Sequence, residues 1–128
     1  MAEQALHRLR KICLALPEAV EKPFGAHVTF RIRDKNFAMY MDNHHGDSRL
    51  ALWCKAPKGA QEILTEADPE RFFVPPYVGP KGWIGLRLDR AIDWKALTDL
   101  VIESYQLIAP GRLVARVKRP WGASPRQH

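Results

Sequence analysis

The sequence lacks any long apolar run, and its N-terminus lacks the basic, apolar and small-residue pattern of a secretory signal. A membrane-spanning helix needs about 20 mostly apolar residues, so we expect no membrane partner. Cysteine is also scarce, because only Cys13 and Cys54 are present and they show no CxxC spacing. Two isolated thiols are typical of small core residues in a reducing compartment, so we expect a cytoplasmic protein. A disulfide between them stays open as an alternative.

The common signatures of enzymes are absent as well. The chain contains no GxSxG elbow, P-loop, GxGxxG within a βαβ unit, or HExxH. The run Gly79-Pro80-Lys81-Gly82 is too short and too interrupted by proline to cradle a phosphate. Because no pair of carboxylates is tied to a cleft, we expect a non-enzymatic protein without a cofactor. An enzyme of another type would need a pocket with several convergent polar groups.

One cluster, His44, His45 and Asp47, resembles a set of metal ligands. Adjacent residues in a turn rarely point at the same ion, and a zinc site needs three or four convergent ligands. No distant partner for this cluster stands out in the sequence. We therefore expect an exposed turn here and no metal site.

The composition is that of an ordinary globular domain. The chain has 128 residues, of which 46% are hydrophobic and 27% charged, with a net charge of +6. Residues 109–128 hold five basic residues and no acid, whereas 1–108 hold 15 basic and 14 acidic residues. We expect one domain over 1–117, with a basic, flexible tail over 118–128, in a monomer. A basic tail attracts polyanions, although a merely solvated end is an equally good interpretation.

The hydrophobic periodicity predicts helices and strands in separate runs. Helices are expected over about 3–16, 57–66 and 94–108, strands over 18–22, 28–33, 37–41, 49–55 and 83–88, and one more helical turn within 112–117. Pro23-Phe24-Gly25 and Asp34-Lys35-Asn36 are expected turns. Asp93 is the expected N-cap of the last long helix. Segregated strands and helices predict an α+β fold, an antiparallel sheet covered on one face by helices. The outer face would carry Thr29, Arg31, Arg33, Tyr40 or its neighbours, Trp53, Trp83 and Arg87.

The stretch from Phe72 to Asp89 is the richest in aromatic residues, proline and glycine. It predicts a stiff loop leading into a strand, with Lys81, Trp83 and Arg87 projecting on one side. Its glycines allow tight turns and close backbone approach. The alternative is a covered sheet end with a structural tryptophan, since the sequence does not decide whether Trp53 and Trp83 are exposed.

Several short motifs together resemble the MmcQ/YjbR family of small bacterial proteins, over about residues 1–117. They are Pro23-Phe24-Gly25, Phe37-Ala38-Met39, Pro76-Tyr77 through Lys81-Gly82-Trp83-Ile84-Gly85 to Leu88-Asp89, and Ser104-Tyr105 with Ala109-Pro110-Gly111-Arg112-Leu113. The resemblance implies a frataxin (CyaY)-like fold, a double-wing arrangement and DNA binding. The frataxin likeness also raises iron binding along the first helix. That helix offers only Glu3 beside several cations, so we do not expect iron delivery.

Two functions remain in view. The first is DNA binding with low sequence specificity, through phosphate contacts and base stacking. The residues proposed for it are Arg31, Arg33, Lys81, Trp83, Arg87, Arg112 and Arg116. The second is a protein-interaction or small-ligand module, with Phe72, Tyr77 and Trp83 lining a pocket or docking patch. Arginines converging around exposed aromatics would favour DNA, whereas buried aromatics and arginines paired with acids would weigh against it.

Overall fold

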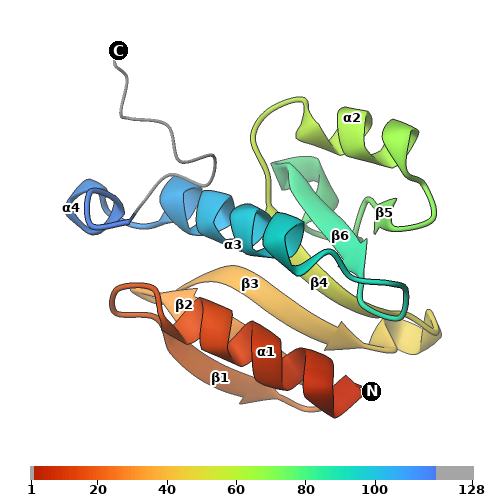
Figure 1. Cartoon of the computed structure of the whole chain (residues 1–128), viewed down its shortest axis with the longest axis horizontal. Helices are drawn as coiled ribbons and strands as arrows, with labels where there is room; N and C mark the ends of the chain where they lie inside the picture. Colours follow the sequence, from red (N-terminus) through yellow and green to blue (C-terminus); the bar gives the residue numbers. More distant parts are fainter. Residues whose placement is uncertain (1, 118–128) are drawn as a thin grey trace.

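The computed structural model describes residues 2–117, which form an α+β protein (Figure 1). The predicted basic tail, 118–128, lies outside the described residues. The elements are α1 (Ala2–Leu14), β1 (Val20–Phe24), β2 (His27–Ile32), β3 (Lys35–Asp42), the 3₁₀ turn His44–Gly46, β4 (Leu50–Lys55), α2 (Ala60–Ala67), β5 (Phe72–Phe73), the 3₁₀ turn Gly79–Lys81, β6 (Trp83–Arg87), α3 (Trp94–Ile108) and α4 (Gly111–Val114).

The strands form one antiparallel sheet in the order β1-β2-β3-β4-β6-β5. The first four follow one another as a meander, because short connections can join antiparallel neighbours. Figure 1 shows α1 and α3 lying across one face of the sheet, while α2 lies beyond its edge beside β5 and β6. The predicted α+β class with an antiparallel sheet is therefore confirmed.

The main core lies between these two long helices and the sheet. α1 contributes Leu9 and Cys13, and α3 contributes Leu97 and Val101, all fully buried. Each buried aliphatic side chain of this size stabilises the fold by about 1.5–3 kcal/mol. Both cysteines are buried and free, so the disulfide alternative is wrong. Because side chains alternate along a strand, the sheet contributes one residue in two, including Val28, Phe30, Ile32, Ala38, Tyr40, Leu52, Cys54, Ile84 and Leu86.

Two neighbouring side chains of α3 connect this helix to other parts of the core. Ser104 Oγ accepts a hydrogen bond from Lys55 N at 2.9 Å and donates one to the Phe37 carbonyl at 2.6 Å. The Tyr105 hydroxyl donates to the Pro17 carbonyl at 2.6 Å. Buried backbone groups need such partners, so these bonds fix where α3 sits on the sheet. Asp93 caps α3 as predicted, its Oδ1 accepting from Ala96 N at 3.1 Å.

The edge strand β1 and the hairpins differ from the sequence prediction. Phe24 pairs with His27, so Pro23-Phe24 belongs to β1, and the turn is confined to Gly25 and the next residue. Proline is tolerated because an edge strand has one side without ladder partners. In the next hairpin, β3 begins at Lys35, and the turn consists of the two residues 33 and 34, both with positive φ.

Helix ends also shift by up to three residues. α1 ends at Leu14 instead of 16, and α2 begins at Ala60 instead of 57. The two-residue strand β5 is not predicted by any periodic pattern, because it is too short to show one.

Candidate functional site

The sheet face turned away from α1 and α3 is half covered. Trp53 and Trp83 lie on this face, yet they are only 2% and 7% exposed. Phe73 and Val78, from the segment that follows α2, pack against them in a second, smaller core. The sequence did not decide whether Trp53 and Trp83 are exposed, and the structure shows that both are buried. Trp83 is therefore a structural residue at a covered end of the sheet.

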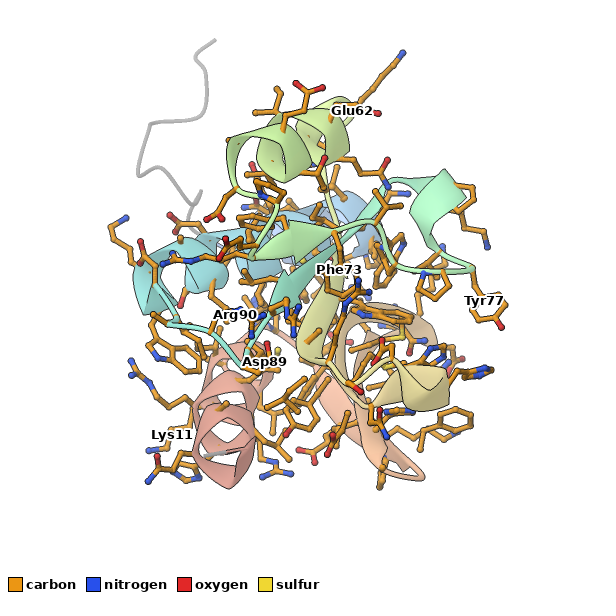
Figure 2. The ribbon with its side chains drawn as sticks, turned by 90° about the vertical axis from the view of Figure 1, so that its right-hand side faces the viewer. Lys11, Glu62, Phe73, Tyr77, Asp89 and Arg90 are labelled. Atoms are coloured by element: carbon orange, nitrogen blue, oxygen red, sulfur yellow. The ribbon has the colours of Figure 1, made fainter. Side chains whose placement is uncertain are left out.

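A glycine of β6 permits this cover. Gly85 pairs with Trp53 on one side and with Phe73 on the other. The Phe73 ring crosses so close to Gly85 that an added Cβ would meet its Cζ atom at 2.4 Å. The guanidinium carbon of Arg49 lies over the same ring, 4.0 Å from its centroid, and makes a cation–π contact with it. Figure 2 shows Phe73 near the middle of this side of the molecule.

The uncovered half of the face, over β1, β2 and β3, holds an open pocket of about 280 Å³. Met39 and Met41 form its buried apolar floor, whereas the wall residue Phe24 is 70% exposed. Methionine side chains are flexible and polarisable, so such a floor adapts to the shape of a ligand. The lining residues are Lys22, Pro23, Phe24, Thr29, Arg31, Asn36, Met39 and Met41.

Two polar groups of the pocket have unused hydrogen-bonding capacity. Arg31 and Asn36 are directly opposite in the β2–β3 ladder. Arg31 donates from Nη2 to the Asp34 carbonyl at 2.8 Å, and its buried Nε has no partner. The Asn36 Oδ1 atom is also buried without a partner, and its Nδ2 makes only a long contact to Met39 Sδ at 3.8 Å. Buried polar atoms are usually satisfied, so these exceptions need an explanation.

A row of rings continues from the pocket to the end of the sheet. The Phe24 ring centroid lies 6.4 Å from that of His27, which lies 5.6 Å from that of His44. His44 stacks on His45 at 4.2 Å, and Tyr77 lies 6.0 Å from both. The row joins three separate segments of the chain. Tyr77, the outermost ring, is 71% exposed and projects from the molecule in Figure 2.

The backbone around this row is strained. Asn43, His45, Ser48 and Tyr77 all have φ between 50° and 66°. Such values are uncommon for residues other than glycine, and they persist where the surrounding structure enforces them, often at functional sites. Burial lowers the pKa of His44, and the neighbouring His45 and then His27 lower it further.

The residues proposed for nucleic acid differ in their surroundings. Only Arg31, among the seven, lines the pocket. Arg87 donates from Nε and Nη2 to the Asp89 carboxylate at 2.9 Å, and Arg33 donates from Nε to Glu18 at 2.8 Å. Both arginines are therefore paired with acids.

The remaining proposed cations are exposed. Lys81 lies in the second 3₁₀ turn, Arg112 in α4 and Arg116 just after it. The hydrogen bond from Arg33 lowers the pKa of the Glu18 carboxyl, and the charges of Arg112 and Arg116 lower it further. Three of the seven proposed residues thus lower the pKa of one acid, and none of the three lines the pocket.

Sequence reasoning missed most of the pocket, although one signal was available. The alternation of β3 places Tyr40 on one face and its neighbours Met39 and Met41 on the other. Tyr40 faces the helices and the two methionines face the pocket. Sequence reasoning placed Thr29, and Tyr40 or its neighbours, on the outer face but assigned them to no site. The lining residues that it did not place on that face are Lys22, Pro23, Phe24 and Asn36, with His27 beside them.

Residues 2–117 contain neither a cluster of metal ligands nor a membrane-spanning helix. No group of three or more His, Cys, Asp or Glu side chains in this part of the chain has a geometry that could hold a metal ion. None of its helices combines the length and the apolar character needed to cross a membrane.

The fold and the site define a small α+β protein with a half-covered sheet and a pocket on the uncovered half. A family model described as YjbR matches residues 14–107, so the chain belongs to the YjbR family. The crystal structure of Deinococcus radiodurans protein DR2400, with the family-model domain DUF419, matches with a TM-score of 0.70 and 22% sequence identity. The match covers 96% of this chain and 94% of that chain, and at this identity it shows a shared fold. No curated protein matches the sequence.

Proposed function

We propose that this protein is a non-enzymatic module that binds a small ligand in the pocket over β1, β2 and β3. The observation that carries the proposal is the unequal cover of one sheet face. The half over β4 and β6 is closed by Phe73 and Val78, whereas the half over β1–β3 has an open pocket with Met39 and Met41 as its floor. An apolar pocket with a few polar groups is the usual form of a small-molecule site.

The size of the pocket limits the ligand. A volume of about 280 Å³ lies just below the range of roughly 300–1,000 Å³ that is typical of drug-sized ligands. The occupant is therefore a small metabolite, and a folded protein partner would contact only the rim. Phe72 and Trp83, which the sequence proposed as lining, are half-buried and buried and do not line this pocket.

The ionisable side chains favour binding over catalysis. The two in the lining, Lys22 and Arg31, are both cations. General acid–base chemistry needs a donor and an acceptor of protons placed together, and this lining does not provide that pair.

A screen of small, chemically diverse fragments tests the proposal. The chain has three methionines, and two of them line the pocket, so protein labelled with methyl-¹³C methionine gives few and informative signals. We expect fragments to shift the Met39 and Met41 signals. Thr29→Phe fills the pocket and should abolish these shifts. Ile63→Phe adds a ring to an exposed residue of α2 outside the lining, and should leave them unchanged. The absence of shifts at millimolar fragment, or equal shifts in Thr29→Phe, would refute the proposal.

DNA binding is the second candidate function. Its support is that Lys81, Arg112 and Arg116 are exposed and have no acidic partner within 4.0 Å among residues 2–117. Against it, Trp83 is buried, and Arg33 and Arg87 are paired with acids. The frataxin-like double-wing arrangement, the monomeric state and the cytoplasmic location stay predictions.

DNA binding is tested by fluorescence anisotropy of labelled single- and double-stranded DNA. Phosphate contacts weaken steeply between about 50 and 200 mM salt. If these cations bind DNA, replacing all three by alanine should weaken binding at the lower salt concentration. Binding that is lost only on truncation after Val117 would assign the affinity to the tail, and no binding at either concentration would remove the candidate.

A further inference from the structure

The volume of the pocket limits the size of a ligand, and its side chains also indicate a chemical class of ligand, granted the proposed function. The geometry points to a planar aromatic anion, a molecule of one or two flat rings that carries a carboxylate or a phosphate. Three features of the site carry this inference: an exposed ring beside two methionines, an arginine without an acid, and an unsatisfied amide.

The apolar part of the pocket suits a flat ring. Phe24 forms one wall and leaves 70% of its surface exposed, so its face is free to stack on a ligand. Aromatic pairs prefer offset or edge-to-face packing. The thioethers of Met39 and Met41, on the floor, make favourable contacts with ring edges. An aliphatic ligand would fill the same space and gain neither kind of contact.

The charged part of the pocket suits an anion. Glu21, in β1, points to the other side of the sheet and pairs with Arg10 at 2.7 Å. Lys22 lies on the pocket side, and it has no ion pair with an acid among the described side chains. Within residues 2–117, Arg31 has no acidic partner within 4.0 Å, and its one hydrogen bond goes to a backbone carbonyl. The planar guanidinium of arginine matches carboxylate and phosphate groups in a bidentate manner.

The unsatisfied atoms fit the same ligand. Arg31 Nε and Asn36 Oδ1 are both buried, and they belong to residues directly opposite in the β2–β3 ladder. An anion that draws the guanidinium outward would uncover both atoms. The Asn36 oxygen would then accept a hydrogen bond from a ring N–H. An aromatic anion with a ring nitrogen thus satisfies the arginine and the amide together.

The test is a titration of the methyl-¹³C methionine protein with four probes. Indole-3-acetate is the aromatic anion, indole is the neutral ring, cyclohexanecarboxylate is the aliphatic anion, and adenosine monophosphate supplies ring and phosphate from a nucleotide. We expect indole-3-acetate to bind at least about tenfold more tightly than indole or cyclohexanecarboxylate, because charge-assisted hydrogen bonds are the strong ones. Comparison with the nucleotide distinguishes a carboxylate from a phosphate as the preferred anion.

Two variants assign the preference to residues. Arg31→Gln should weaken indole-3-acetate binding about tenfold and leave indole unchanged, because a bond to a charged group is lost. Arg33→Gln removes the same charge two residues away, outside the pocket, and should change neither. Phe24→Leu keeps an apolar wall, so it should weaken both indole probes and spare cyclohexanecarboxylate.

The outcomes separate the ligand class from the proposed function. Equal binding of the aliphatic and aromatic anions, or of indole and indole-3-acetate, would overturn the ligand class while leaving a small-molecule site in place. The same holds if other fragments shift Met39 and Met41 and these four probes do not. If no fragment of any kind shifts them, both proposals fail. The comparison of probes uses the unaltered protein, so it does not depend on a variant that folds.

Discussion

Replacement of Gly85 by alanine is expected to loosen the cover over the tryptophans. The added Cβ would lie 2.4, 2.6 and 2.7 Å from the Cζ, Cε2 and Cε1 atoms of Phe73. Ordinary contacts of this kind fall between 3.4 and 4 Å, so the ring has to move by about 1 Å. The ring also makes the cation–π contact with the Arg49 guanidinium at 4.0 Å and packs against the second core. Displacement of the ring therefore disturbs the cation–π contact and the packing of this core.

The expected cost follows from overpacking. Forcing extra atoms into a packed site destabilises a protein by about 1–3 kcal/mol. For a domain of this size, 1 kcal/mol corresponds to roughly 4 °C, so the melting temperature should fall by about 4–12 °C. Gly111→Ala is the matched control. A Cβ at Gly111 meets nothing within 4 Å and its φ is not positive, so this variant should be neutral or slightly more stable.

A double-mutant cycle in urea identifies Phe73 as the cause. With Phe73→Ala in place the added methyl group has room, so Gly85→Ala should cost almost nothing further. The coupling free energy between the two changes should then be at least about 1 kcal/mol, as is typical of residues in contact. Additive effects of the two substitutions would refute the reasoning, because the destabilisation would then arise from the strand itself and not from the ring.

Three further predictions concern the core and the histidines. Ser104→Ala leaves the Lys55 amide and the Phe37 carbonyl without partners, so it should lower the free energy of unfolding by roughly 1–3 kcal/mol for each group left unsatisfied; Thr98→Ala, which removes a bond within α3, should cost less than Ser104→Ala. Burial first, and then His45 and His27, lower the pKa of His44 from its ordinary value of 6.5, so the unfolded chain binds more protons, and the stability due to this group is present above that value and lost as the pH falls below it. Urea unfolding between about pH 7.5 and 5.5 should therefore show a smaller loss in His44→Gln than in the wild type, and an equal loss would assign the effect to other groups. Burial raises the pKa of Cys54 to about 12 and also raises that of Cys13, so a thiol reagent at mildly alkaline pH should label both thiols after denaturation and neither before it, and rapid labelling of the native protein would contradict their burial.

The sequence predicted the parts of the fold that local chemistry determines. The alternation of Val28, Phe30 and Ile32 assigns a face to β2, and these residues are buried as expected. Asp93 as an N-cap is also a local signal, since a short polar side chain satisfies the first free amide groups of the helix that follows it. Such patterns involve residues that are close in the sequence, so they can be recognised without knowledge of the tertiary structure.

Contacts between distant segments were not predictable in the same way. Arg33 and Glu18 are 15 residues apart, and their ion pair exists because the turn after β2 meets the segment before β1. The proximity of Phe73 to Gly85 likewise depends on a two-residue strand that leaves no periodic signal. The pairing of Arg33 with an acid was missed for this reason, since this arginine was counted as free before its partner was known.

The motifs that resemble the family and the residues that line the pocket overlap only in part. Ser104, Tyr105 and Gly85 belong to the motifs, and each has a structural role in the core or under the cover. The overlap consists of Pro23, Phe24 and Met39, which are the apolar wall and part of the floor. The motifs therefore define the fold and the apolar frame of the pocket.

The polar residues of the pocket lie outside those motifs; they are Lys22, Thr29, Arg31 and Asn36. The preference for a ring should then depend on the motif residues, and the preference for an anion should depend on the cations that lie outside the motifs. A family member that has Phe24 and Met39 at these places but no cation in place of Arg31 should still bind indole and should not favour indole-3-acetate. If such a member favours indole-3-acetate over indole as strongly as this protein does, the charge that selects the anion lies elsewhere on the sheet. Arg31 is then not the selecting residue.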